Sequence, residues 1–88
     1  MAINRVVLMG GLDRQAAQVC QKLGRTDLAV VATKSRRVSF RNTDLLLLVQ
    51  NFGSHSQLAY VRSQGGNVVF SRGGVTSWVT TIKTVLGI

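Results

Sequence analysis

A run of basic residues in the middle of the sequence holds the side chains best suited to chemistry with phosphate groups. Between Lys34 and Arg41 the chain reads Lys-Ser-Arg-Arg-Val-Ser-Phe-Arg. Proteins use cationic and hydroxyl side chains of this kind to contact the phosphate backbone of nucleic acids. We therefore expect a nucleic-acid-binding segment, with a solvated surface loop as the alternative interpretation. The expected contact residues are Lys34, Arg36, Arg37 and Arg41.

Phe40, the aromatic residue within this basic run, has two interpretations. Its ring could stack on a nucleobase, because every base offers a flat aromatic face. A lone aromatic residue among cations more often packs against the edge of the hydrophobic core. The local structure also has two interpretations, because Val38-Ser-Phe40 fits either a short extra strand or an apolar plug.

The overall charge of the chain also favours a polyanionic partner. The 88 residues include 11 Lys and Arg against 3 acidic residues, which gives a formal net charge of +8. A field of this sign attracts nucleic acids, phosphorylated ligands and anionic membrane surfaces, but it carries no sequence specificity. The composition therefore predicts the class of partner and leaves DNA and RNA equally open.

Three glycine-rich loops form a second candidate site. Residues 10–14, 51–56 and 71–77 each follow an expected strand and open an expected helix. Helix N-termini attract anions, and glycines let a phosphate approach the backbone. The alternative is that these glycines serve turn geometry alone, because no GxGxxG or GxxxxGK[ST] pattern is present. The expected phosphate or ligand contacts are Gly10, Gly11, Arg14, Ser54, His55, Arg72, Gly73 and Gly74.

The sequence offers little for catalysis or for a cofactor. His55 is the single histidine, and the nearest acid that could orient it, Asp13, is better explained as a helix cap. Cys20 stands alone, without the clustered Cys and His residues that zinc requires. We therefore expect no enzyme, no cofactor and no metal site.

The length predicts one domain covering residues 1–88. The longest apolar run, residues 45–49, is far too short for a membrane span, and no secretory signal is recognisable. With one cysteine the chain fits a reducing compartment, so we expect a cytoplasmic protein without membrane contact.

Apolar patterning predicts the elements that must position these residues. Short apolar runs indicate strands at 5–9, 27–32, 44–49 and 67–71. The first three are expected to be buried on both faces, as in parallel sheets. Helical spacing follows Asp13 and Ser54, and it recurs from Val75 through Trp78 to Leu86. We expect a small three-layer α/β sandwich with a mostly parallel sheet in the order 2-1-3-4, a Rossmann-like half.

Three short features together resemble a known family. Gly10-Gly11 ends the first strand, Ser54-His55 opens a helix, and Ser71-Arg-Gly-Gly-Val-Thr-Ser77 opens the last helix. This arrangement resembles the small bacterial "domain of unknown function 2325" family over nearly the whole chain. The resemblance implies the same fold and points to the same loops without naming a ligand. The chain departs from that family in its middle. Domains of that family often carry polar site residues in this segment, whereas this chain has the Arg cluster of residues 34–41 there.

Three functions are therefore compatible with the sequence. The leading hypothesis is a non-catalytic nucleic-acid-binding domain that contacts DNA or RNA through the Arg-rich segment. The second is a sensor or binding domain for a nucleotide or another phosphorylated small molecule at the glycine-rich loops. The third is a self-associating adaptor for an acidic protein partner, because short sheet edges and a 9.5 kDa size favour a homo-oligomer.

Overall fold

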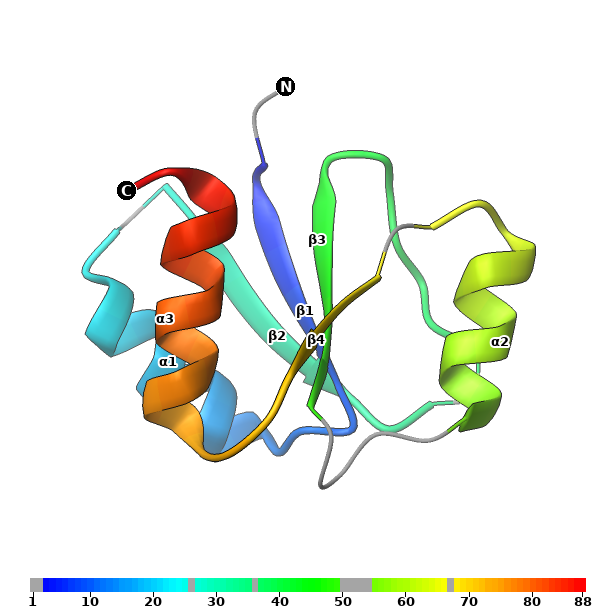
Figure 1. Ribbon diagram of the computed structural model, residues 1–88, viewed down its shortest axis with the longest axis horizontal. Helices are drawn as coiled ribbons and strands as arrows, with labels where there is room; N and C mark the ends of the chain where they lie inside the picture. The colour runs from blue at the N-terminus through cyan, green and yellow to red at the C-terminus, as the bar shows by residue number, and fades with distance from the viewer. Residues whose placement is uncertain (1–2, 26, 36, 50–54, 67) are drawn as a thin grey trace.

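Four parallel strands form the centre of the fold. The computed structural model describes residues 3–25, 27–35, 37–49, 55–66 and 68–88 of the chain. The strands within this part are β1 (Arg5–Met9), β2 (Ala29–Thr33), β3 (Asp44–Val49) and β4 (Val68–Ser71). They pair in the order β2-β1-β3-β4, and every pairing is parallel (Figure 1). The predicted α/β class and strand order are confirmed.

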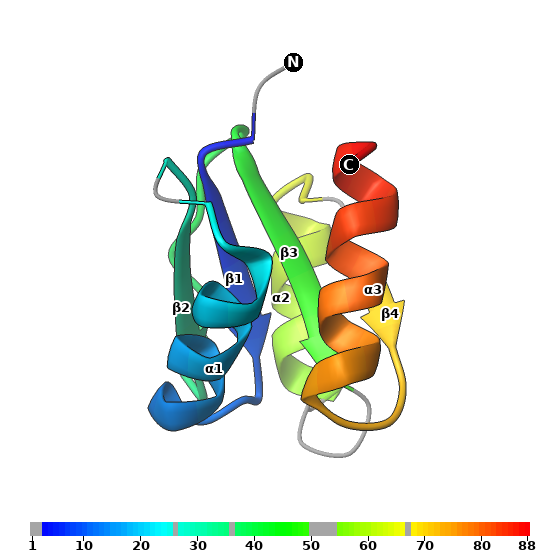
Figure 2. The ribbon, with the colours of Figure 1, turned by 90° about the vertical axis from the view of Figure 1, so that its left-hand side faces the viewer.

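Helices cover both faces of this sheet. Helices α1 (Asp13–Leu23) and α3 (Val75–Leu86) lie on one face, and α2 (His55–Ser63) lies on the other (Figure 2). Because successive side chains of a strand point to opposite faces, β1 contributes to two cores. Val6 and Leu8 pack with α1 and α3, whereas Val7 and Met9 pack on the α2 side.

Strand β2 differs from its prediction in position and in burial. The sequence suggested residues 27–32, but pairing with β1 begins at Ala29 and extends to Thr33. Asp27 belongs instead to the preceding turn, where its carboxylate accepts a hydrogen bond from Arg25 Nε at 3.0 Å. Burial on both faces was also wrong, because β2 lies at the sheet edge and Val31 is 38 % exposed.

Helix α1 begins without the predicted cap. Leu12 occupies the N-cap position and Asp13 is the first helical residue, so the carboxylate of Asp13 makes no capping hydrogen bond. Gln15 compensates, because its Oε1 accepts a hydrogen bond from the Leu12 N–H at 2.8 Å. The predicted end is confirmed: Gly24 adopts a left-handed conformation and its N–H donates to the Cys20 carbonyl.

The apolar spacing of α3 outweighs its many β-branched residues. Trp78, Val79 and Ile82 are buried on the stripe that the sequence shows, and Trp78 belongs to the core between the sheet, α1 and α3. Helix α3 ends at Gly87, whose φ is 73°. The predicted helix is therefore confirmed, and packing of its apolar face explains it better than intrinsic propensity does.

No helix among the described residues is long and apolar enough to cross a membrane.

Truncation of one buried side chain should show whether core packing, rather than intrinsic helix propensity, stabilises α3. Ile82→Ala should lower the free energy of unfolding by about 2–5 kcal/mol, because Ile82 is fully buried. Val85→Ala on the same helix should cost little, since Val85 is 43 % exposed. Chemical denaturation followed by circular dichroism would measure both, and equal losses would contradict this account of α3.

Candidate nucleic-acid interface

The connection between β2 and β3 carries the Arg-rich run along one face of the sheet. We call residues 34–43 the crossover segment. It starts where β2 ends and finishes where β3 begins, so it runs from the carboxyl edge of the parallel sheet back to the amino edge (Figure 1). Within its described part it contains no strand or helix. Val38, 3 % exposed, and Phe40 pack into the core on the α2 side, which is the predicted apolar plug.

This path separates cations that are neighbours in the sequence. Lys34 borders a hollow at the carboxyl edge together with Gly11 and Asp13. Arg41 borders hollows at the amino edge, beside Arg5 in one of them. A strand of five residues spans about 16 Å, and the crossover segment runs back over a strand of that length. Lys34 and Arg41 therefore do not form a single cluster.

A buried amide holds the start of the crossover segment. The Gln57 side chain, in α2, is 1 % exposed, and its Nε2 donates to the carbonyl oxygens of Thr33 at 3.2 Å and Ser35 at 2.9 Å. These bonds and the Val38 plug fix the backbone. Lys34, Arg37 and Arg41 then lie exposed, whereas Arg36 falls outside the described residues.

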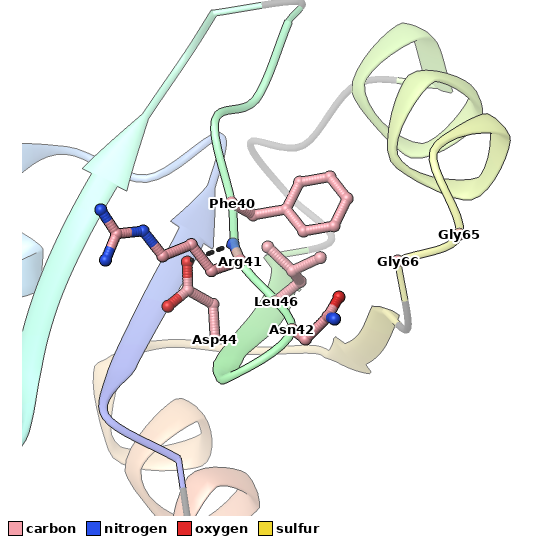
Figure 3. Close-up of a pocket in the computed structure, with 7 residues that line it drawn as sticks. All are labelled: Phe40, Arg41, Asn42, Asp44, Leu46, Gly65 and Gly66. Carbon is pink, nitrogen blue, oxygen red and sulfur yellow. Dashed lines mark hydrogen bonds between the residues drawn. The ribbon is translucent and has the colours of Figure 1, made fainter.

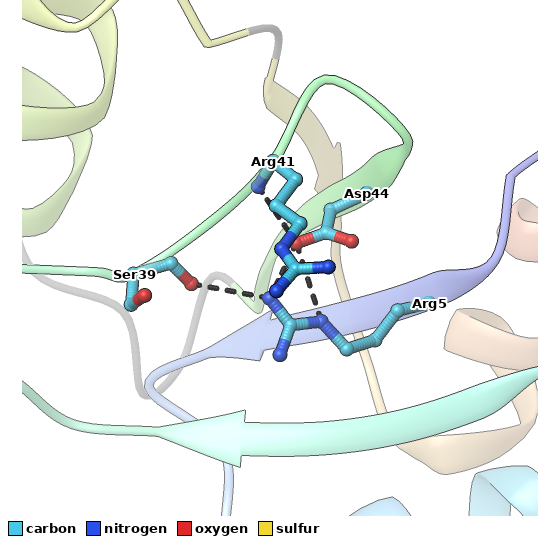
Figure 4. A network of polar contacts seen from close by, with 4 residues as sticks. All are labelled: Arg5, Ser39, Arg41 and Asp44. Atoms are coloured by element: carbon cyan, nitrogen blue, oxygen red, sulfur yellow. Dashed lines mark hydrogen bonds and ion pairs between the residues drawn. The ribbon is translucent and has the colours of Figure 1, made fainter.

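A carboxylate network holds the other end of the crossover segment (Figure 4). Asp44 opens β3 in register with Arg5, which opens β1. The Asp44 Oδ2 accepts hydrogen bonds from Arg5 Nε at 3.2 Å, from Arg5 Nη2 at 2.5 Å and from the Arg41 backbone N–H at 2.9 Å. Arg5 Nη2 also lies 3.4 Å from the Ser39 carbonyl oxygen. One carboxylate thereby joins two strands to the crossover segment.

The environment of Asp44 keeps it ionised. Burial acts to raise the pKa of this carboxyl, whose side chain is 3 % exposed. The hydrogen bonds from Arg5 and the Arg41 N–H, together with both guanidinium charges, outweigh burial and lower the pKa below its ordinary value of 3.8. Arg5 is thus partly neutralised, while no carboxylate of the described residues pairs with Arg41.

Exposed charge is distributed unevenly between the two outer layers. The crossover segment and α2 carry the exposed cations Lys34, Arg37, Arg41 and Arg62. Within the described part of this layer no carboxylate is exposed. Asp13, at the start of α1, and Asp27, in the turn before β2, are exposed on the opposite layer. They offset part of the charge of the exposed cations of that layer, which are Arg14, Lys22 and Lys83. The layer formed by α2 and the crossover segment is therefore the more positive surface of the described structure.

The glycine-rich loops gather at the carboxyl edge, but two of their glycines already have structural roles. The Gly10 N–H donates to the Thr33 carbonyl oxygen at 2.7 Å, so it is not free for an anion. Gly11 is buried, and a Cβ there would lie 3.3 Å from the Leu8 Cβ. Arg14, the first cation after these glycines, is exposed.

The structure describes most of the other predicted loop residues. Arg72 and Gly73 are exposed before α3, and Gly74 is the N-cap residue of that helix. Gly73 has a φ of 84°, a conformation that glycine adopts without strain. His55 begins α2, and Ser54 lies outside the described residues. Within the described residues no group of three His, Cys, Asp or Glu side chains could hold a metal ion.

The sequence reasoning missed the polar residues that fix the crossover segment. Arg5 and Asp44 were detectable, because opposite charges stand at the first position of two apolar runs. Gln57 gave a weaker signal, as a polar residue four positions before the buried Val61 on the apolar side of α2. Asn42 gave no signal, because an amide in a loop is usually solvated.

The two sheet edges retain exposed apolar side chains. Val31 of β2 is 38 % exposed and Phe70 of β4 is 43 % exposed, and both belong to edge strands. The Arg62 guanidinium lies 5.9 Å from the centre of the Phe70 ring and shields part of it. The homo-oligomer stays a prediction, with these edges as its natural contact surfaces.

Loss of the Asp44 carboxylate should destabilise the fold in a pH-dependent way. At neutral pH, Asp44→Asn should lower the free energy of unfolding by about 1–3 kcal/mol, because Arg5 loses a charged acceptor. The folded pKa of Asp44 is below 3.8. The carboxylate therefore stabilises the fold fully well above that pH, and its contribution is lost as the pH falls through the folded pKa.

Urea denaturation at several pH values would measure this difference. The gap between the native sequence and Asp44→Asn should close in strong acid. Asp27→Asn is the control, because Asp27 forms an exposed ion pair with Arg25 whose side chains are 65 % and 37 % exposed, and it should have a much smaller effect. A gap that persists unchanged in acid would contradict the assigned role of the Asp44 charge.

Removal of the buried amide should loosen the crossover segment. Gln57→Ala deletes the hydrogen bonds to the Thr33 and Ser35 carbonyl oxygens and should cost about 1–3 kcal/mol of stability. Trypsin should then cleave faster after Lys34 and Arg37 than it cleaves the native chain. Gln64→Ala, which truncates an exposed amide just after α2, is the control. Equal cleavage rates in all three proteins would argue against this anchor.

Comparison with known proteins identifies no relative of this chain. No family model, no curated protein and no solved structure matches the chain. The resemblance to the "domain of unknown function 2325" family therefore stays a prediction based on Gly10-Gly11, Ser54-His55 and the loop before α3. The function of the chain has to be inferred from its own residues.

Proposed function

We propose that this protein is a small, basic, non-catalytic nucleic-acid-binding domain. The single observation that carries the proposal is the charge of the layer formed by the crossover segment and α2. Lys34, Arg37, Arg41 and Arg62 are exposed there, and the described part of that layer has no exposed carboxylate. A polyanion that approaches Arg37, Arg41 and Arg62 meets cations without an exposed carboxylate of this layer, whereas Asp13 of the opposite layer lies near Lys34.

The mechanism of binding is neutralisation of phosphates. Each Lys or Arg that contacts a phosphate releases condensed counterions, so the affinity falls steeply as the salt concentration rises. Phosphate contacts fix the position of the ligand but carry no sequence information. We therefore expect DNA and RNA to bind with modest sequence preference.

The fixed backbone of the crossover segment favours this mechanism. Gln57 holds its start, Asp44 holds the N–H of Arg41 near its end, and Val38 and Phe40 anchor its middle. Cations on a backbone that is already ordered lose less conformational entropy on binding than cations on a free loop. Arg14, in the first turn of α1, and Arg72, in the loop before α3, are exposed at the carboxyl edge and extend the basic surface beyond Lys34.

The glycine-rich loops support a phosphorylated small ligand less well. The N–H of Gly10 is already bonded to Thr33, and the exposed Asp13 borders the same hollow as Lys34. A carboxylate at this place repels a phosphate. The sensor for a nucleotide or phosphorylated small molecule is therefore the second candidate.

Neutralising two cations on the proposed interface should weaken binding. Arg37→Gln with Arg41→Gln should flatten the log–log salt dependence by about 1.5, which corresponds to two lost phosphate contacts. Arg41→Gln retains the backbone hydrogen bond to Asp44. Fluorescence anisotropy of labelled DNA and RNA at several salt concentrations would measure the slopes.

A charge-matched variant on the opposite layer is the control. Lys22→Gln with Lys83→Gln removes two exposed cations, one from α1 and one from α3. This variant should keep a slope close to that of the native chain. If both double variants lose affinity equally, binding depends on net charge alone and the assigned interface is wrong. If the native chain binds neither DNA nor RNA at low salt, the proposed function is wrong.

A further inference from the structure

We propose that the hollow lined by Phe40, Asn42 and Leu46 takes one unpaired nucleobase, so that the ligand of this domain is single-stranded nucleic acid. The inference rests on the proposed function and makes it more specific. We call this cavity the base hollow, of about 300 Å³. Its lining residues are Phe40, Arg41, Asn42, Asp44, Leu46, Gly65 and Gly66 (Figure 3).

The walls of the base hollow suit a flat apolar ring. Leu46, 1 % exposed, forms its inner wall, and the half-buried Phe40 contributes an aromatic surface. Gly65 and Gly66 line the hollow with backbone, and no atom lies within 4 Å of the position that a Cβ would take at Gly65. Aromatic side chains in such places bind bases by stacking, and they accept any base because each has a π face.

Close packing fixes the position of the Phe40 ring. A Cβ at Gly66 would lie 2.9 Å from two carbons of this ring and 2.5 Å from the Val61 Cγ1. Glycine at position 66 therefore allows the turn after α2 to touch Phe40 directly. The ring is held against the Gly66 backbone, which lines the same hollow, and a base that enters the hollow meets a preformed surface rather than a mobile side chain.

The uncharged polar side chain that lines this site is the amide of Asn42. Its side chain lines the hollow (Figure 3), and it forms no hydrogen bond with any of the described residues. An amide offers both donors and an acceptor, which match the hydrogen-bonding edge of an unpaired base. In a duplex that edge is already paired, so the base hollow selects a single strand.

A second hollow provides a place for the attached phosphate. It shares Arg41 and Asp44 with the base hollow and adds Arg5 and Thr43. Asp44 is buried and bonded to Arg5, so its charge is largely compensated. Arg41 lines both hollows, and its side chain lies beside Arg5 and Asp44 (Figure 4). Its guanidinium can therefore reach a phosphate while the neighbouring base occupies the base hollow.

Strands with and without bases provide the test. We would titrate the native chain against fluorescently labelled oligothymidylate, an abasic strand of equal length and a duplex containing the same strand. The abasic strand retains every phosphate, so phosphate contacts alone would bind it as tightly. We expect the base-bearing strand to bind about tenfold more tightly than the abasic strand, and also more tightly than the duplex.

Two variants link that difference to the base hollow. Phe40→Leu removes the ring but keeps an apolar side chain against Val61 and Gly66. Asn42→Ala removes an exposed amide without a hydrogen bond to the rest of the described chain, so it should leave folding intact. Each should reduce the preference for bases by about threefold or more without changing the salt dependence. Gln18→Ala on α1, which truncates an exposed amide on the other layer, should change nothing.

The outcomes separate this inference from the proposed function. Equal binding of base-bearing and abasic strands with steep salt dependence would overturn the base hollow and leave the phosphate-binding domain intact. Absence of binding to every strand would overturn both. A preference for bases that persists in Phe40→Leu and Asn42→Ala would place the base elsewhere and overturn the assignment. Tighter binding of thymidine monophosphate than of the strand would overturn it in favour of a free nucleotide.

Discussion

The return of the chain from β2 to β3 is the constraint on which the arrangement of this protein depends. Both strands are parallel to β1, which lies between them, so the connection has to cross the sheet from its carboxyl edge to its amino edge. A longer connection would form a helix, as most such crossovers do. Here residues 34–43 are too few for a full covering helix, and an extended segment runs along the face with Val38 and Phe40 inserted into the core.

Because an extended segment lacks the regular backbone hydrogen bonds of a helix, other elements have to satisfy most of its backbone groups. At the start of the segment Gln57 donates hydrogen bonds to the Thr33 and Ser35 carbonyl oxygens, and near its end the Asp44 carboxylate accepts one from the Arg41 N–H. Both polar groups are buried, and burial of a polar group costs free energy unless the group is hydrogen-bonded. These hydrogen bonds therefore offset the cost of burying the two side chains. The same two anchors orient the cations outward, and they leave the hollows beside Arg41 between the segment, α2 and the first residues of β1 and β3.

The basic surface and the base hollow therefore share one structural cause. Anchoring of the crossover segment turns Arg37 and Arg41 to solvent while it turns Phe40 toward Gly66 and Val61. The proposed phosphate-binding surface and the proposed base hollow then lie next to each other, which is the combination that proteins use for single strands. The opposite layer, with α1 and α3 around Trp78, serves mainly to bury the other face of the sheet.

The sequence by itself determined the elements and their order. The apolar runs at 5–9 and 44–49 and the spacing from Val75 to Leu86 are local signals, and the structure reproduces them. Local patterns could not show that β2 lies at an edge with Val31 exposed, or that Leu12 rather than Asp13 occupies the N-cap position of α1. The tertiary structure alone decided that Lys34 and Arg41 lie at opposite edges of the sheet. It also decided that Arg5 of β1 borders one hollow beside the crossover segment, and that Gly66 borders another together with Asn42. These relations join residues far apart in the chain, and their distances follow from the packing of α2 and the crossover segment on the sheet rather than from any periodicity of neighbouring residues.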